Sequence, residues 1–204
     1  METPAFYAQV PRLAVHDPLA EFLGAATDGR IEYGYLDAVK LAGHSCPTVA
    51  AAYWMTLKAL ASLYPDSLPQ RGGIRVEFHQ DKLSGVTGVM ANVITLLTGA
   101  TQDTGFKGIA GRFDRRQLLY FSANVGEEIR YTRLDTGQAV DVAAHLQSVP
   151  FAPQTAELMQ KCLAGSATPE EAAEFRACWQ ARVRAVLLEH GDDPQVFVLR
   201  PVGQ

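Results

Sequence analysis

A histidine and a cysteine stand two residues apart, directly in front of the most apolar segment of the chain. They are His44 and Cys46, in the run Gly-His-Ser-Cys-Pro-Thr at residues 43–48. Pro47 suits the first turn of a helix, because the N–H that it lacks would have no partner there. The free backbone N–H groups and the dipole of such a helix N-terminus favour a thiolate at Cys46. Since thiolate and neutral imidazole are ligands of zinc, copper and iron, the pattern predicts a transition-metal site.

The other two cysteines, Cys162 and Cys178, lie among alanines and leucines and are expected to be inert packing residues. An odd count without a C-x-x-C pair argues against a disulfide framework and against an all-cysteine zinc ribbon. A metal site must therefore recruit histidine, carboxylate or water. Cys46 has a second interpretation, because free cysteine is among the most buried residue types and can serve packing alone.

Two further histidines are candidates for the missing ligands. Residues 74–79, I-R-V-E-F-H, alternate as in a strand, which places His79 and Glu77 on one face. His79 is the first choice, with Glu77 as a partner that orients its ring. His145, at the end of the last predicted core strand, is the second candidate. The remaining histidines are expected at the surface: His16 and His190.

The surrounding segments predict an α+β fold, in which an antiparallel or mixed sheet packs on a buried central helix and a helical pair follows. Residues 48–63 carry Lys58 as their only charge, so a helix there is apolar nearly all round and must be buried. Residues 1–18 are expected to form an irregular arm. Helices are also predicted at residues 19–26, 35–41, 89–97, 155–163 and 169–190, and strands at residues 74–79, 118–122, 129–134, 139–142 and 196–199.

At two prolines, Pro150 and Pro153, the sequence changes from predicted strands to predicted helices. We therefore predict an α+β core over residues 1–150 and a helical annex with a final strand over residues 151–204. With 204 residues, 48% of them hydrophobic, the chain is long enough for one substantial core.

Composition excludes several classes of partner. The net charge of -4 provides no broad positive field for a nucleic-acid backbone. The sequence has no apolar run long enough to span a membrane and no secretory signal, so a cytoplasmic location is expected. The helical pair at residues 155–163 and 169–190 is richer in apolar residues than a peripheral hairpin needs, which predicts a homodimer.

The run at residues 43–47, followed by a small-residue helix with Tyr53, resembles the H-G-H-x-C-P-G-x-x-x-G-Y opening of FmdE, a family of formylmethanofuran dehydrogenase proteins. Residues 92–101, N-V-I-T-L-L-T-G-A-T, resemble the family's D-A-I-Q-x-L-T-G-C-T segment, and Lys107-Gly108 falls where the family has its K-G loop. The resemblance covers about residues 35–145. It implies an α+β core, frequent dimerisation and a metal near the start of the buried helix, with His44 and Cys46 as the ligands that carry over.

The chain departs from the family pattern at several positions. Ala42 stands where the family has its first histidine, Asn92 replaces an aspartate, and Val89 and Ala100 stand where cysteines are frequent. With three scattered cysteines, the zinc finger that some members append is absent. A metal site in this divergent member must draw its replacement ligand from elsewhere, and His79 is preferred to His145.

Three functions remain open at this point. The first is a metal- or haem-binding protein, an enzyme or a sensor, with zinc as the first expectation and iron or haem also admissible. The second is a metal-free structural or small-molecule-binding homodimer with a degenerate site. The third is an enzyme whose nucleophile is Cys46, with His44 as its base. No catalytic residue is assigned in the first two.

Overall fold

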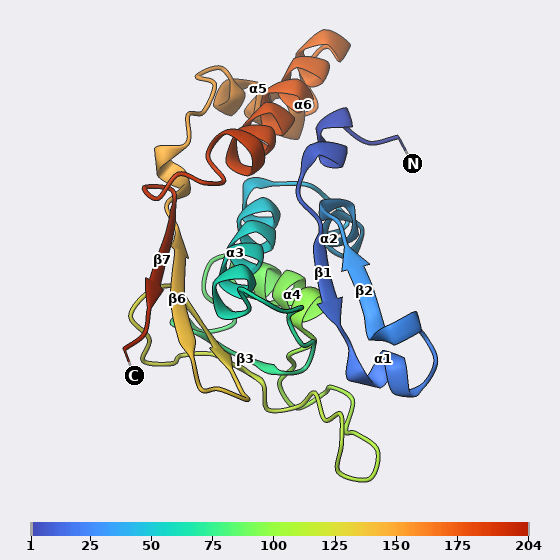
Figure 1. Cartoon of the computed structure of the whole chain (residues 1–204). Helices are drawn as coiled ribbons and strands as arrows, with labels where there is room; N and C mark the ends of the chain where they lie inside the picture. The colour runs from blue at the N-terminus through green and yellow to red at the C-terminus, as the bar shows by residue number, and fades with distance from the viewer. Residues whose placement is uncertain (1, 204) are drawn as a thin grey trace.

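A computed structural model describes residues 2–203 of the chain. At its centre lies the long helix α3, which contacts strands of the main sheet on one side and α4 and α2 on the others (Figure 1). The helices are α1 (Pro18–Phe22), α2 (Tyr35–Ala42), α3 (Pro47–Leu63), α4 (Thr87–Thr98), α5 (Thr155–Leu163) and α6 (Pro169–Arg184), which continues as a π-helical turn (Ala185–Glu189). The strands are β1 (Leu13–His16), β2 (Arg30–Tyr33), β3 (Ile74–Phe78), β4 (Leu119–Tyr120), β5 (Ile129–Arg133), β6 (Ala139–Ala144) and β7 (Phe197–Pro201).

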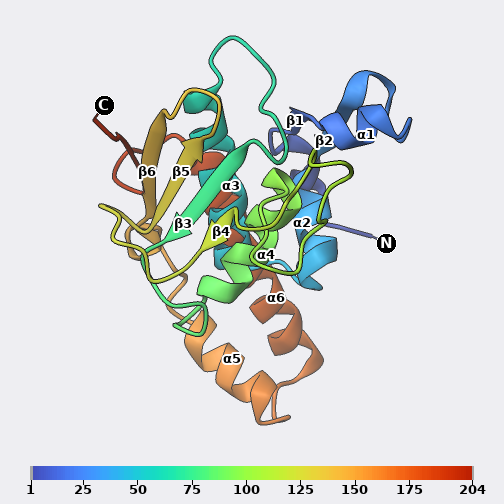
Figure 2. The ribbon, with the colours of Figure 1, turned by 90° about the horizontal axis from the view of Figure 1, so that it is seen from below.

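The main sheet has five strands in the order β4-β3-β5-β6-β7. Strand β4 runs parallel to β3, whereas every other neighbouring pair is antiparallel. Figure 2 shows β6, β5, β3 and β4 side by side, with α3 behind them. The predicted α+β fold, a mixed sheet packed on a buried central helix, is therefore confirmed.

Helix α3 is buried over most of its length, as its composition requires, and Ala61 and Ser62 in its last turn are exposed. Most of its apolar side chains from Val49 to Leu63 belong to the core. The buried hydroxyl of Thr56 donates to the carbonyl oxygen of Ala52 and lies 3.0 Å from the hydroxyl of Tyr131 on β5. Helix and sheet are thus joined by a polar contact inside an apolar interior.

Residues on both sides of position 150 share the sheet and the core. Strand β7 pairs with β6, and Val183, Val186 and Leu187 pack in the same cluster as α3. The far end of the α5–α6 hairpin projects from the body (Figure 2). The division into a core and an annex remains a prediction.

The structure corrects three of the sequence-based expectations. The N-terminal arm is not irregular throughout, because residues 13–16 form β1 and pair antiparallel with β2, a strand that was not predicted. The helix expected at residues 19–26 ends at Phe22, and Gly24 follows with φ 67°. The long last helix changes to π-helical geometry at Ala185. Within residues 2–203, no helix has both the length and the apolar character needed to cross a membrane.

Candidate functional site

The predicted histidine and cysteine lie on a tight turn between α2 and α3. Gly43 ends α2 in the left-handed conformation, with φ 75°, and its N–H donates to the carbonyl oxygen of Val39. Cys46 is the N-cap of α3: the backbone N–H of Val49 donates to its sulfur at 3.5 Å. The cysteine is 9% exposed. The expected position of Cys46 at the helix N-terminus is therefore correct.

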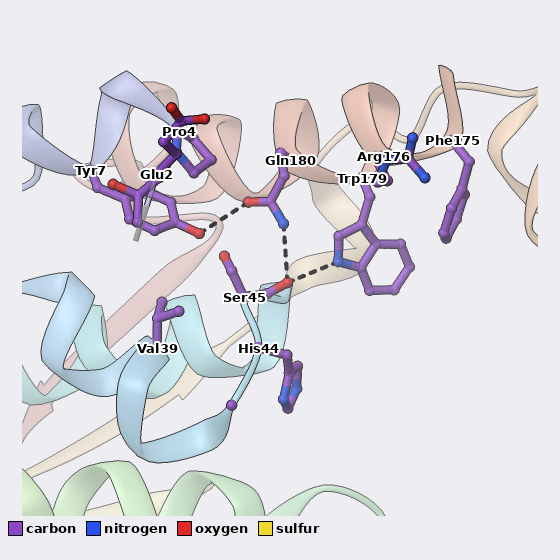
Figure 3. Close-up of a pocket in the computed structure, with 12 residues that line it drawn as sticks. Glu2, Pro4, Tyr7, Val39, His44, Ser45, Phe175, Arg176, Trp179 and Gln180 are labelled. Atoms are coloured by element: carbon purple, nitrogen blue, oxygen red, sulfur yellow. Dashed lines mark hydrogen bonds between the residues drawn. The ribbon is translucent and has the colours of Figure 1, made fainter. Parts of the chain in front are cut away.

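Hydrogen bonds at Ser45 connect this turn to neighbouring elements. The Ser45 hydroxyl lies 2.9 Å from the hydroxyl of Tyr35. Its carbonyl oxygen accepts hydrogen bonds from Trp179 Nε1 at 3.0 Å and Gln180 Nε2 at 3.3 Å, both on α6 (Figure 3). The hydroxyl of Tyr7 in turn donates to Gln180 Oε1 at 3.3 Å. The turn is therefore tied to the N-terminal segment, to α2 and to α6.

His44 is exposed, and its ring is oriented by the backbone. Nδ1 lies 2.9 Å from the carbonyl oxygen of Ala42, an atom that can only accept, so Nδ1 carries the proton. In the neutral ring this leaves Nε2 with a free lone pair. Metal-binding histidines commonly donate their other ring N–H to a carbonyl in this way.

A cavity of about 380 Å³ opens beside the turn, between α2, α6 and the N-terminal segment. Figure 3 shows His44 and Ser45 on one side of it, with Tyr7, Trp179 and Gln180 on the other. The Phe175 and Trp179 rings stand 5.8 Å apart on the α6 side. This volume and a mostly apolar lining with a few polar groups are typical of small-molecule sites. The lining residues are Glu2, Thr3, Pro4, Tyr7, Val39, Gly43, His44, Ser45, Phe175, Arg176, Trp179 and Gln180.

The other predicted ligands lie outside this turn. His79 is exposed just after β3, and its backbone N–H donates to the backbone carbonyl oxygen of Glu128. Glu77 bonds Arg75 at 3.2 Å, so its partner is not a histidine. His145 is exposed just after β6. Among residues 2–203, no three or more histidine, cysteine, aspartate and glutamate side chains form a group that could hold a metal ion.

The two histidines expected at the surface are both partly buried, and each contacts a carboxylate. His16 Nε2 lies 2.9 Å from Glu21, and His190 Nδ1 lies 3.3 Å from Asp193. Neither lines the cavity beside Ser45.

A half-buried carboxylate, Glu128, was not predicted from the sequence. Burial raises its pKa, although the Ala144 N–H that donates to it at 3.3 Å and the charge of His145 act in the opposite direction. It lines a smaller cavity of about 150 Å³ together with Thr48 at the start of α3. Its sequence context, a pair of glutamates before a strand, resembles an ordinary solvated turn.

Tyr7, Trp179 and Gln180, which line the cavity beside Ser45, were also not predicted from the sequence. The reason is different, because they lie far along the chain from Ser45.

The turn alone offers too few ligands to complete the coordination of a metal ion, so it fits a metal only if other groups fill the remaining positions. Imidazole nitrogen and cysteine sulfur suit zinc and iron, and His44 Nε2 has no protein partner among the described residues. The turn supplies two such donors, His44 and Cys46, whereas structural zinc takes four. The remaining positions would have to come from water, from a bound small molecule or from a second copy of the chain.

A comparison with family models identifies a match over most of the chain. The model described as "FmdE, Molybdenum formylmethanofuran dehydrogenase operon" matches residues 41–192, well over half of the chain. The matched segment begins at the end of α2, just before the turn with His44 and Cys46, and ends beyond α6. No curated protein matches the chain.

Proposed function

This chain belongs to the FmdE family, and from that premise we propose that it binds a small molecule beside Ser45, with a transition-metal ion held at the adjacent His44–Cys46 turn. The observation that supports this most is the hydrogen bond from His44 Nδ1 to the Ala42 carbonyl, which leaves Nε2 free at the rim of the cavity. Zinc is the first choice and iron, including haem iron, the second, because both accept imidazole and thiolate.

The residues of the cavity would have separate tasks. Phe175 and Trp179 provide an aromatic wall for a flat or apolar part of the small molecule. Ser45, with its carbonyl fixed by two donors from α6, keeps the turn in place. When bound, the metal would act as a Lewis acid toward a polar atom of that molecule. No catalytic residue is proposed.

We also propose a homodimer, in keeping with the missing ligands. Leu163 at the end of α5 is 78% exposed on the projecting hairpin, where a second copy would cover it. Val183, Val186 and Leu187 are used in the core and are not free for this purpose. Light scattering at micromolar concentration tests the proposal: a mass of two chains supports it, and a mass of one chain removes it.

The test of the metal proposal is the metal content and visible absorption spectrum of the protein as isolated, before any affinity column that leaches metal. We expect about one zinc or iron per chain, and a haem would show in the spectrum at once. Protein that contains no metal, and takes up neither zinc nor ferrous iron on dialysis, would contradict the proposal.

A metal-free binding protein is the second candidate. It is favoured by the use of the Cys46 sulfur as a helix cap and by the lack of a three-ligand group among residues 2–203. The third candidate, a cysteine nucleophile, has less support, because Cys46 is 9% exposed and the Nδ1 of His44 faces a carbonyl. The cytoplasmic location remains a prediction.

A further inference from the structure

A second cavity, of about 430 Å³, lies where α1, β1, the segment 70–72 and the loop between α4 and β4 meet. Figure 1 shows α1 and this long loop at one end of the molecule and α6 at the other, so the second cavity is remote from the turn with His44. Its polar lining is rich in arginine. The charged and aromatic residues that line it are His16, Arg71, Arg112, Phe113, Asp114 and Arg115.

Two of these arginines share a single carboxylate. Arg71 Nη1 lies 3.0 Å from Asp17 Oδ2, and Arg115 Nη2 lies 2.7 Å from Asp17 Oδ1. Asp17 also accepts the N–H groups of Leu19 and Ala20 as the cap of α1. Two positive charges against one negative charge leave a surplus of positive charge at the wall of the cavity.

Arg115 has a donor that the described residues leave without a partner. The side chain is buried, with 5% of the residue exposed, and its Nη1 has no hydrogen-bond acceptor. Nη1 lies against Gly72, which lines the cavity: a Cβ built on Gly72 would come within 2.5 Å of it. A buried guanidinium donor without an acceptor costs free energy. Arg115 therefore has hydrogen-bonding capacity that its pair with Asp17 does not use.

Arg112 adds a third guanidinium, and this one is exposed. It stacks on the ring of Phe113 at 4.7 Å. Asp114, the acidic residue of the lining, is paired with Arg116 at 2.7 Å, and Asp17 is paired with Arg71 and Arg115. Among residues 2–203, these carboxylates form no ion pair with Arg112. Phe113 itself has a φ of 65°, which is unusual for a bulky residue.

We propose that this cavity binds the phosphate group of a small phosphorylated molecule. Guanidinium groups match phosphate oxygens in pairs, and three of them around one opening suit a dianion. The chain as a whole has a net charge of -4, so the positive surplus is local to the site. The cavity is larger than one phosphate needs, and the ring of Phe113, which lines it, would pack against the organic part.

The test is calorimetric titration of the full chain with inorganic phosphate, at a salt concentration that screens weak surface attraction. We expect saturable binding by the unaltered protein. Arg112→Gln should weaken it by about tenfold or more, because a charged hydrogen bond is lost. Arg200→Gln is the matched control: Arg200 is an exposed arginine on β7, paired with Glu127, and its loss changes the net charge equally.

Arg115→Lys is the second variant, because it keeps the charge and removes the unpartnered Nη1. It should fold, as judged by circular dichroism, and bind phosphate more weakly. The proposal is overturned if phosphate does not bind the unaltered protein, if Arg112→Gln binds as well as the unaltered protein, or if Arg200→Gln loses as much affinity as Arg112→Gln. In that last case the attraction is only general electrostatics. Metal content is expected to stay the same in all these variants.

Discussion

Trp179 donates a hydrogen bond from its indole Nε1 to the carbonyl oxygen of Ser45 at 3.0 Å, across a separation of 134 residues. The bond joins α6 to the turn that carries His44 and Cys46. It also closes one side of the cavity in which we propose that a small molecule binds.

Trp179→Phe tests this relationship, because it keeps an aromatic wall and removes the donor. We expect the free energy of unfolding to fall by about 1 kcal/mol, the usual net value of one hydrogen bond plus a small packing loss. Metal or ligand binding should fall further than stability alone explains, since the turn gains freedom. Chemical denaturation and calorimetry measure the two effects. Phe175→Leu is the control, because it changes the same wall and leaves the bond to Ser45 intact.

His44→Ala and Cys46→Ala should each abolish stoichiometric metal binding, because the single donor that remains competes poorly with water. Both variants should keep the far-ultraviolet circular dichroism spectrum of the parent. His190→Ala is the control, since His190 lies 3.3 Å from Asp193 and does not line the cavity beside Ser45. Elemental analysis decides the matter. Full metal occupancy in either folded variant at the turn would mean that the site lies elsewhere.

His79→Ala and His145→Ala address the missing ligand. Neither residue takes part in a three-ligand group among residues 2–203, so we expect both variants to retain their metal. If both variants retain the metal, the remaining coordination positions of the metal are filled by water or by the bound molecule. Loss in one of them, with the dimer intact by light scattering, would identify that histidine as a ligand supplied by a rearrangement or by a second copy.

Asp17 should make the stability depend on pH. Burial alone raises the pKa of its carboxyl, but hydrogen bonds from Arg71 and Ala20 and the charge of Arg115 outweigh it and lower the pKa below 3.8. A lowered pKa in the folded state stabilises the fold above the unfolded pKa, and this contribution is lost as the pH falls through the folded pKa.

Asp17→Asn therefore should cost about 3 kcal/mol at pH 7, because two arginines lose their partner and Arg115 is buried. The difference from the parent protein should shrink below about pH 4, where the carboxyl begins to be protonated in the unfolded chain. Urea denaturation at a series of pH values measures it. Asp114→Asn is the control at an exposed pair. A constant difference from pH 7 to pH 3 would contradict the assignment.

Much of the fold could be predicted because its signals are local. The helix at residues 47–63 follows from an apolar run with one charge, and β3 follows from the alternation of residues 74–78, which are buried at every second position. The turn between α2 and α3 follows from Gly43, which takes the left-handed conformation, and from Pro47, which starts the next helix. Each of these patterns reflects backbone geometry over a few residues.

The partners of that turn could not be predicted in the same way. Ser45 meets Trp179 and Gln180, and Asp17 meets Arg115 across a separation of 98 residues. No spacing in the sequence encodes such pairs, because they arise only when separate helices and loops pack on one core. The candidate ligands His79 and His145 show the same limit. The sequence placed them correctly at strand ends, but only the packing of the sheet on α3 decided that both are exposed there.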